Sequence, residues 1–274
     1  LLIGTGLYFT IKLRGLQITK FPRAVRIIFE KESGTGSGEG DVSAFATLCT
    51  TMAADIGTGS IVGVATALRI GGPGSLFWMW ISAILGMVTK YSESLLAVKY
   101  RVTDENNQMA GGPMFYIQNG MGERFIWLAK IFSVFGICTA LFGCGTFPQV
   151  NAITESVNVT FHIPIIVAGV IVTILTAVVT IGGIKSISKV AEIVVPIMAL
   201  TFLGGSVVAL VINRAAVPDA FKTIFTCAFA KESVIGGTAG TGVITFMTVM
   251  RTGIARGVYT NEAGLGSSPI VAAA

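Results

Sequence analysis

Six stretches of this 274-residue chain are each long and apolar enough to cross a lipid bilayer. A transmembrane helix needs about 20 mostly apolar residues, because each residue adds about 1.5 Å toward a hydrocarbon core of about 30 Å. The predicted spans are residues 44–70, 72–98, 124–152, 164–184, 190–212 and 229–254. Residues 1–11 read as the end of a further span. We therefore predict an all-α membrane protein built as a multi-span helix bundle.

The composition excludes several other classes of protein. Only 12% of the residues are charged, about half the share found in soluble domains. The net charge of +5 is spread between the apolar runs and forms no basic stripe, so no nucleic-acid partner is expected. Charges placed this way suit the loops of a multi-pass protein embedded in a lipid bilayer. The four cysteines form no C-x-x-C pair, so neither a zinc site nor a disulfide framework is indicated.

The chain divides by pattern into three parts. Residues 15–32 interleave apolar and basic side chains, which predicts an amphipathic segment lying along the membrane surface. A Gly/Ser stretch at 33–40 then predicts a flexible joint. We expect 1–43 to hold the end of a peripheral span, the amphipathic cytoplasmic segment and a linker, 44–228 a first five-helix repeat with its outer loop, and 229–274 the start of a second repeat. Because the chain begins without Met inside one apolar run and stops at the start of another, we expect a piece of a longer protein.

The 44–70 span is interrupted by a polar segment near its middle. Thr58 lies 14 residues from one end of this span and 12 from the other, close to the bilayer midplane. Gly57 and Gly59 each weaken a helix by about 1 kcal/mol. An opened helix exposes peptide groups, and the membrane tolerates them only where they line a cavity or hold a ligand. The alternative is that these glycines are close-packing faces between helices.

A second glycine cluster, Gly236-Gly-Thr-Ala-Gly-Thr-Gly242, interrupts the 229–254 span in the same way. Five predicted spans begin before this one, at residues 44, 72, 124, 164 and 190. Because five is odd, the second broken helix runs through the membrane in the opposite sense to the first, as an inverted repeat requires. Close packing through Gly236 and Gly237 is again the alternative.

An opened helix offers ligands for both a cation and an anion. The N–H groups that start its second half suit a carboxylate, and the carbonyls that end its first half suit a cation, so an amino acid bound with sodium satisfies both. Asp55 adds a carboxylate near the bilayer centre, where an unpaired charge costs about 2.5–3.5 kcal/mol. Its candidate partners are Na⁺, a substrate ammonium group or a proton. Asp55 and Thr58 are therefore candidate sodium ligands, and a protonated, packed Asp55 is the alternative.

The 124–152 span carries polar residues at helical spacing. Thr139, Gly143, Thr146 and Gln149 recur at steps of four, three and three, which places them on one face of a helix, and Pro148 predicts a kink in it. The Gln149 amide both donates and accepts hydrogen bonds, which suits the polar ends of an amino acid. A hydrogen bond to a neighbouring helix is the alternative role for this side chain.

The residue patterns leave three kinds of function open. No H-E-x-x-H or G-x-S-x-G motif occurs, so an enzyme is not indicated. A channel would use the Gly-Thr-Gly segments as a carbonyl-lined filter and conduct ions without an amino acid. A membrane scaffold would use the glycines only for packing, whereas a symporter would use both breaks to hold its substrates.

Several longer runs resemble the alanine or glycine:cation symporter family, and the resemblance covers essentially the whole chain. The runs are Gly57–Thr66, Gly71–Trp80, Thr89–Arg101, Gly111–Tyr116 and Ala255–Ser267, the last of which reads ARGVYTNEAGLGS. The resemblance implies a sodium-coupled importer of small amino acids in the inner membrane of a prokaryote, with no organic cofactor. It also implies the five-plus-five inverted-repeat fold of leucine-type sodium symporters, with two broken helices and alternating access.

The resemblance extends to individual positions. It implies that Gly57, Thr58 and Gly59 form the cradle for the substrate carboxylate and the ion. Gly236 and Gly237 are similar to the counterpart at the second break, and Gln149 resembles a substrate-facing glutamine. Ser60 stands where the family often has Asn. The oligomeric state is not indicated.

Overall fold

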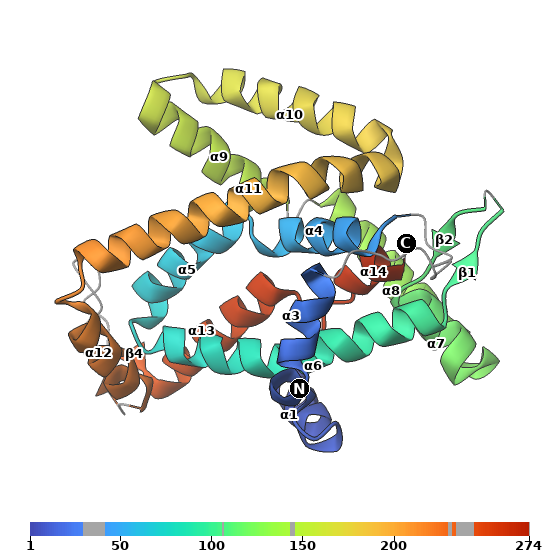
Figure 1. Cartoon of the computed structure of the whole chain (residues 1–274), viewed down its shortest axis with the longest axis horizontal. Coiled ribbons are helices and arrows are strands. Elements are labelled where there is room, and N and C mark those ends of the chain that lie inside the picture. Colours follow the sequence, from blue (N-terminus) through green and yellow to red (C-terminus); the bar gives the residue numbers. More distant parts are fainter. Residues whose placement is uncertain (30–41, 106, 143–145, 230–231, 234–243, 274) are drawn as a thin grey trace. The chain divides into compact units, whose positions relative to one another are not determined.

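The computed structural model describes the chain except residues 30–41, 106, 143–145, 230–231, 234–243 and 274. Most described residues are helical, and two short pairs of antiparallel strands complete the structure (Figure 1). The helices are α1 (Leu2–Lys12), α2 (Leu16–Thr19), α3 (Phe21–Phe29), α4 (Ala44–Asp55), α5 (Thr58–Gly71), α6 (Ser75–Lys99), α7 (Pro113–Met121), α8 (Ile126–Leu141), α9 (Thr146–Phe161), α10 (Ile165–Ile181), α11 (Gly183–Ile212), α12 (Val217–Phe229), α13 (Phe246–Asn261) and α14 (Ser268–Ala273), with a 3₁₀ turn at Glu123–Phe125. Strand β1 (Val102–Thr103) pairs with β2 (Met109–Ala110), and β3 (Glu232–Ser233) pairs with β4 (Ile244–Thr245).

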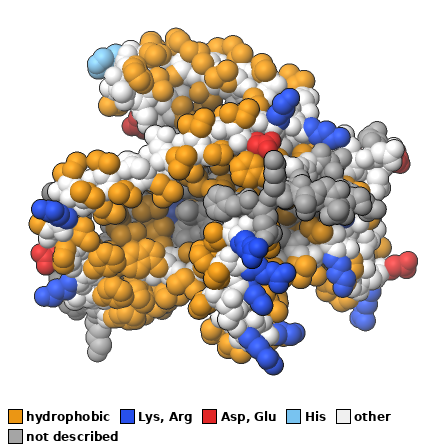
Figure 2. Space-filling model, viewed as in Figure 1, with side chains coloured by type: hydrophobic (Ala, Val, Ile, Leu, Met, Phe, Trp, Pro, Cys, Tyr) orange, Lys and Arg blue, Asp and Glu red, His pale blue; other side chains and the backbone are white. Residues whose placement is uncertain are grey.

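Among the described residues, four helical stretches are long and apolar enough to cross a membrane. They are Ala44–Gly71, which holds α4 and α5, Ser75–Lys99, which is α6, Glu123–Phe161, which holds α8 and α9, and Gly183–Ile212, which is α11; α10 is shorter but strongly apolar. Figure 2 shows apolar side chains over the visible surface of α10 and α11, where Ile166, Ile181 and Ile212 are largely exposed. Large apolar side chains exposed in this way are unfavourable in water and suit contact with lipid. These helices identify the chain as a helical membrane protein.

One compact unit combines Leu1–Arg23, Ser60–Lys90 and Pro196–Gly264. Its centre is the packing of α13 along α6, which depends on glycines that let the two backbones approach. A Cβ on Gly253 would collide with the Ser75 carbonyl oxygen, and a Cβ on Gly257 would lie 2.7 Å from the Ser82 Cβ. Val249, on the same helix, is fully buried.

The same unit holds a cluster of aromatic rings between α6 and α12. The Phe77 ring lies edge-on to the rings of Phe225 and Phe229, with centroids 5.6 and 5.0 Å apart. The Trp78 indole Nε1–H donates a hydrogen bond of 3.1 Å to the Ala228 carbonyl. A half-buried indole N–H gains from such an acceptor, so this bond helps to fix α12 against α6.

The other compact unit combines Ala24–Gly59, Tyr91–Val195 and Leu265–Ala274. In it α7 packs on α8, α9 and α10 form an antiparallel pair, and α14 lies against α4 (Figure 1). A hydrogen bond of 3.1 Å joins the hydroxyls of Thr50 on α4 and Ser188 on α11, and both side chains are buried. In an apolar setting such a bond ties two helices together.

Three of the sequence-based span predictions agree with single helices. The 72–98 and 164–184 spans correspond to α6 and α10. The 190–212 span is confirmed, but α11 begins at Gly183, seven residues earlier than predicted. Gly183 has a φ of +67°, a left-handed conformation that glycine adopts easily. The turn from α10 to α11 therefore takes only Gly182 and Gly183, and a longer loop is not required.

Two other span predictions need correction. The 124–152 span is not one continuous helix, because α8 ends at Leu141 and α9 begins at Thr146. Thr139 therefore shares no continuous helical face with Gln149. Pro148 lies in the first turn of α9, where a missing N–H does little harm, and does not kink a helix interior.

The prediction of a helical span beginning at 229 was also wrong. Helix α12 ends at Phe229, residues 232–233 and 244–245 are paired strands, and α13 begins only at Phe246 and runs to Asn261. An apolar count finds hydrophobic stretches but does not separate a strand from a helix, so it missed these limits.

The N-terminal prediction of helices is confirmed where the structure describes it. The predicted end of a span at 1–11 is α1, and the amphipathic segment forms α2 and α3 up to Phe29. In α3, helical spacing places Phe21 and Val25 on one face and Arg23 and Arg26 on another. Figure 2 shows Lys and Arg side chains gathered over the N-terminal helices. The predicted joint at 33–40 lies outside the described residues.

Candidate substrate site at the helix break

The interruption predicted in the 44–70 span is present between α4 and α5. Helix α4 ends at Asp55, Ile56 leaves the helical region with φ −99° and ψ 64°, and α5 begins at Thr58. The Ile56 N–H still donates to the Met52 carbonyl at 2.8 Å, which closes the last turn of α4. A helix terminus leaves carbonyls at its end and N–H groups at its start without intrahelical partners. The break therefore places acceptors and donors within a few residues of each other.

Gln149 lies directly against this break. Gly57 is buried, and a Cβ at this position would meet the Gln149 Oε1 at 3.2 Å and its Cδ at 3.3 Å. The Thr58 hydroxyl donates to the Gln149 backbone carbonyl at 3.3 Å. Gly57, Thr58 and Gln149, which were inferred from separate parts of the sequence, are thus in contact within one compact unit. Gly59 is the second residue of α5.

The charges at the break favour a cation on one side and an anion on the other. Asp55 is the last residue of α4, where its half-buried carboxylate adds to the negative end of the helix dipole. The first turn of α5 presents the positive end of its dipole. Carbonyl and hydroxyl oxygens beside a carboxylate suit an alkali cation, and N–H groups at a helix start suit a carboxylate. No group of three or more His, Cys, Asp or Glu side chains gathers in the part of the chain that the structure describes.

The second predicted break lies outside the described residues. Gly236 and Gly237 belong to the segment 234–243, and only its flanks are described: β3 before it, and β4 followed by α13 after it. The role assigned to these two glycines remains a prediction.

Sequence reasoning missed two features close to the predicted residues. It did not place Thr50 against Ser188, although both are hydroxyl residues inside apolar or helical segments and could have been marked as a possible pair. The predicted 229–254 span also ended before Arg256, whereas this residue lies within α13 with its guanidinium against Gly63 of α5. No local pattern would have predicted the contact with Gly63, because 193 residues separate the two positions.

The chain is a multi-span helical membrane protein, because it has several long apolar helices. One of these helices is interrupted, with polar groups at the break. Interrupted helices of this kind mark ligand sites in secondary transporters. Residues 1–274 match the sequence profile of the sodium:alanine symporter family. The chain therefore belongs to this family.

Its relatives include transporters from bacteria and an archaeon. The chain is 53% identical to an uncharacterized transporter of Haemophilus influenzae and 44% identical to the sodium/alanine symporter AgcS of Methanococcus maripaludis. It is 34% identical to the probable sodium/glutamine symporter GlnT of Bacillus subtilis. Each match covers 100% of this chain but only 58%, 59% and 54% of the relative, respectively. The chain thus spans somewhat more than half the length of these relatives.

Proposed function

We propose that the complete protein is a sodium-coupled secondary active importer of small neutral amino acids, alanine or glycine, in the inner membrane. The observation that carries the proposal is the contact of Gly57, Thr58 and Gln149 at an interrupted helix. Membership of the sodium:alanine symporter family supports the same activity.

In this proposal the break binds both ends of the amino acid. The N–H groups that begin α5 at Thr58 and Gly59 bind its carboxylate. The Gln149 Oε1, which faces Gly57, accepts from its ammonium group. The close approach of this amide to the backbone leaves little room for a long side chain, which favours alanine or glycine over glutamine.

Sodium binds at the other half of the break. The carbonyls that end α4, the Asp55 carboxylate and the Thr58 hydroxyl supply oxygen ligands of the kind that interrupted helices offer to Na⁺. A bound Na⁺ offsets the negative end of the α4 dipole and so favours capture of the zwitterion. Movement of Na⁺ down its gradient then drives import.

We further propose that transport follows alternating access in a five-plus-five inverted repeat. Residues 44–228 would form the first repeat with its outer loop, and 229–274 the start of the second. Gly236 and Gly237 would then supply the counterpart of the first break. Rocking of one helix group against the other would expose the site first outward and then inward.

The test is uptake of labelled alanine by the complete protein in liposomes with an inward Na⁺ gradient. We expect uptake that disappears when K⁺ replaces Na⁺. Thr58→Val should reduce uptake, whereas Thr51→Val, which removes a hydroxyl that donates within α4 to the Thr47 carbonyl, should not. Gln149→Ala should reduce uptake, and the exposed Gln118→Ala is its control.

The outcomes separate the other two classes of function. A channel would pass Na⁺ without alanine, and a scaffold would show neither alanine uptake nor Na⁺ flux. Uptake that is equal in Na⁺ and K⁺ would contradict sodium coupling. Wild-type uptake by both Thr58→Val and Gln149→Ala would contradict the assigned site.

A further inference from the structure

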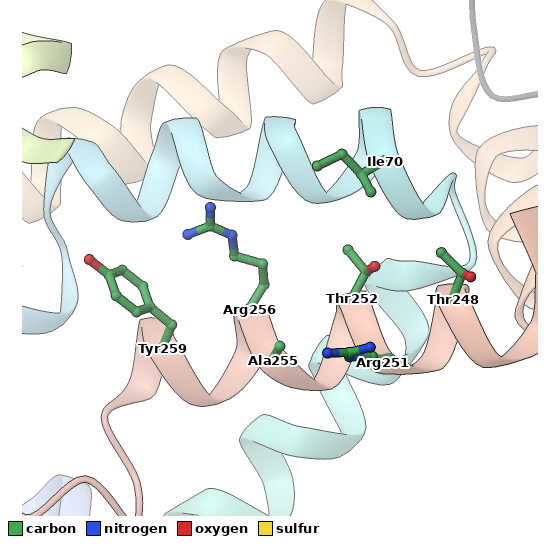
Figure 3. A pocket seen from close by; sticks show the side chains of 7 residues that line it. All are labelled: Ile70, Thr248, Arg251, Thr252, Ala255, Arg256 and Tyr259. Atoms are coloured by element: carbon green, nitrogen blue, oxygen red, sulfur yellow. The ribbon is translucent and has the colours of Figure 1, made fainter. Parts of the chain in front are cut away.

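A cavity of about 510 Å³ lies between α5 and α13, within the unit that contains residues 60–90 and 196–264. Its polar lining comes from α13 and consists of two guanidinium groups and three hydroxyls; α5 contributes Ile70. The polar residues are Thr248, Arg251, Thr252, Arg256 and Tyr259. Figure 3 shows Arg256 and Tyr259 projecting from α13 toward α5. The volume is within the range of about 300–1,000 Å³ that is usual for small-molecule sites.

The charged side chains on the two helices that wall the cavity are all basic. Helix α5 carries Arg69 and α13 carries Arg251 and Arg256, and neither helix contains an Asp or Glu. Glu262 follows α13 directly but does not line the cavity. A half-buried guanidinium group is stabilised by an anion, because partial burial weakens the screening by water. The cavity therefore favours a ligand with negative charge.

Arg256 is held in position by two neighbours. A Cβ on residue 63 would lie only 2.9 Å from the Arg256 Nη1. Glycine at this position therefore lets the guanidinium approach the α5 backbone. On the other side the guanidinium carbon lies 5.4 Å from the centre of the Tyr259 ring, within reach of a cation–π interaction. A guanidinium fixed in this way presents its planar set of N–H donors before any ligand arrives.

We propose that this cavity binds a small carboxylate, with Arg256 as the principal donor and the Thr252 and Tyr259 hydroxyls as further donors. A carboxylate matches the planar fork of a guanidinium with two parallel hydrogen bonds. The identification of this carboxylate as that of a transported amino acid rests on the proposed function; the carboxylate class itself does not. None of the residues that line the cavity belongs to the candidate site at the α4–α5 break.

The direct test uses propionate, which has the carbon skeleton of alanine without its ammonium group. Binding of labelled propionate to the purified complete protein is measured in detergent without Na⁺, so that the proposed sodium site makes no contribution. We expect saturable binding that Arg256→Gln weakens by at least about tenfold, as loss of a charged hydrogen-bond donor predicts. Arg69→Gln removes the same charge from α5 outside the cavity lining and should keep wild-type affinity.

A second variant guards against a loss of binding through misfolding. Tyr259→Phe keeps the ring beside Arg256 but removes the hydroxyl, and should weaken propionate binding several-fold with unchanged thermal unfolding. No propionate binding by the wild type, or equal binding by wild type and Arg256→Gln, would overturn the proposal.

A lipid phosphate is the other source of an oxyanion at this cavity. The same measurement is therefore repeated in nanodiscs of phosphatidylcholine and of phosphatidylglycerol. We expect equal propionate affinity in the two lipids; loss of binding in phosphatidylglycerol alone would assign the cavity to a lipid headgroup and overturn the carboxylate proposal. Propionate binding in a protein without Na⁺-driven alanine uptake would refute the proposed function and leave this inference standing. Na⁺-driven alanine uptake in a protein that does not bind propionate would refute this inference and leave the proposed function standing.

Discussion

Replacement of Gly57 by Ala separates folding from substrate binding. The φ of Gly57 is not left-handed, so the backbone accepts alanine. Because alanine restricts the unfolded chain, the backbone contribution to stability should rise by about 0.4–1 kcal/mol. The new methyl group, however, would lie 3.2, 3.3 and 3.4 Å from the Oε1, Cδ and Nε2 of Gln149. These contacts are shorter than ordinary van der Waals distances, so the amide must move by a few tenths of an ångström.

The displacement should weaken the binding of alanine. Loss of the hydrogen bond from the substrate ammonium group to the Gln149 Oε1, a bond to a charged group, would remove about 1.5–3 kcal/mol, which corresponds to a rise of about 12- to 160-fold in Kd. The assay is binding of labelled alanine to the purified protein at saturating Na⁺, with thermal unfolding measured on the same sample. Gly136→Ala on α8, where a Cβ would meet nothing within 4 Å, is the control and should leave Kd unchanged. Wild-type affinity in Gly57→Ala would refute the assignment of the Gln149 amide to the substrate.

Three further predictions concern stability and titration. Thr50→Val should lower stability by about 1 kcal/mol, because it removes the hydroxyl bonded to the buried Ser188 hydroxyl. A double variant that also carries Ser188→Ala should recover most of the lost stability, as measured by thermal unfolding. Gly253→Ala should lower the stability of the protein by about 1–3 kcal/mol, because its methyl group would collide with the α6 backbone. Gly204→Ala, where a Cβ would meet nothing within 4 Å, is the control and should leave stability unchanged. Equal melting temperatures of the two variants would contradict the close packing of α6 and α13. Burial and the nearby Glu93 carboxylate raise the pKa of Tyr116 to about 12, whereas a tyrosine in the unfolded chain has a pKa near 10. The contribution of this phenol to stability should therefore be full below pH about 10 and be lost as the pH rises through about 12. An ultraviolet titration curve that Tyr116→Phe leaves unchanged above pH about 11 would contradict this.

The apolar runs predicted the helices best where they are long enough to outweigh an interrupting glycine or proline, as Gly86 inside α6 and Pro196 inside α11 illustrate. The spans that became α6, α10 and α11 contain long apolar stretches, and membrane insertion requires little else of a sequence. The break after Asp55 was also predictable, because two glycines flank Thr58 and a helix there is intrinsically weak. Counting apolar residues from 124 to 152 predicted one helix, whereas the structure has α8 ending at Leu141 and α9 beginning at Thr146.

The contacts of the candidate site could be predicted only in part. Gln149 was identified by its chemistry, since an amide in an apolar run needs partners, but its position against Gly57 depends on tertiary packing across 92 residues. The contact between Arg256 and Gly63 has the same origin. Local spacing along one helix carries no information about which helix lies opposite.

The most direct test of the central claim is hydrogen–deuterium exchange of the backbone amides at Ile56–Gly59 in the complete protein. If the peptide groups at this break bind the zwitterion with its sodium ion, these amides should exchange rapidly in K⁺ and become protected when Na⁺ and alanine are added together. Amides within α10, remote in sequence from the break, should not change. Exchange at 56–59 that is the same in all conditions, in a sample that transports alanine, would contradict the claim that this break holds the substrates.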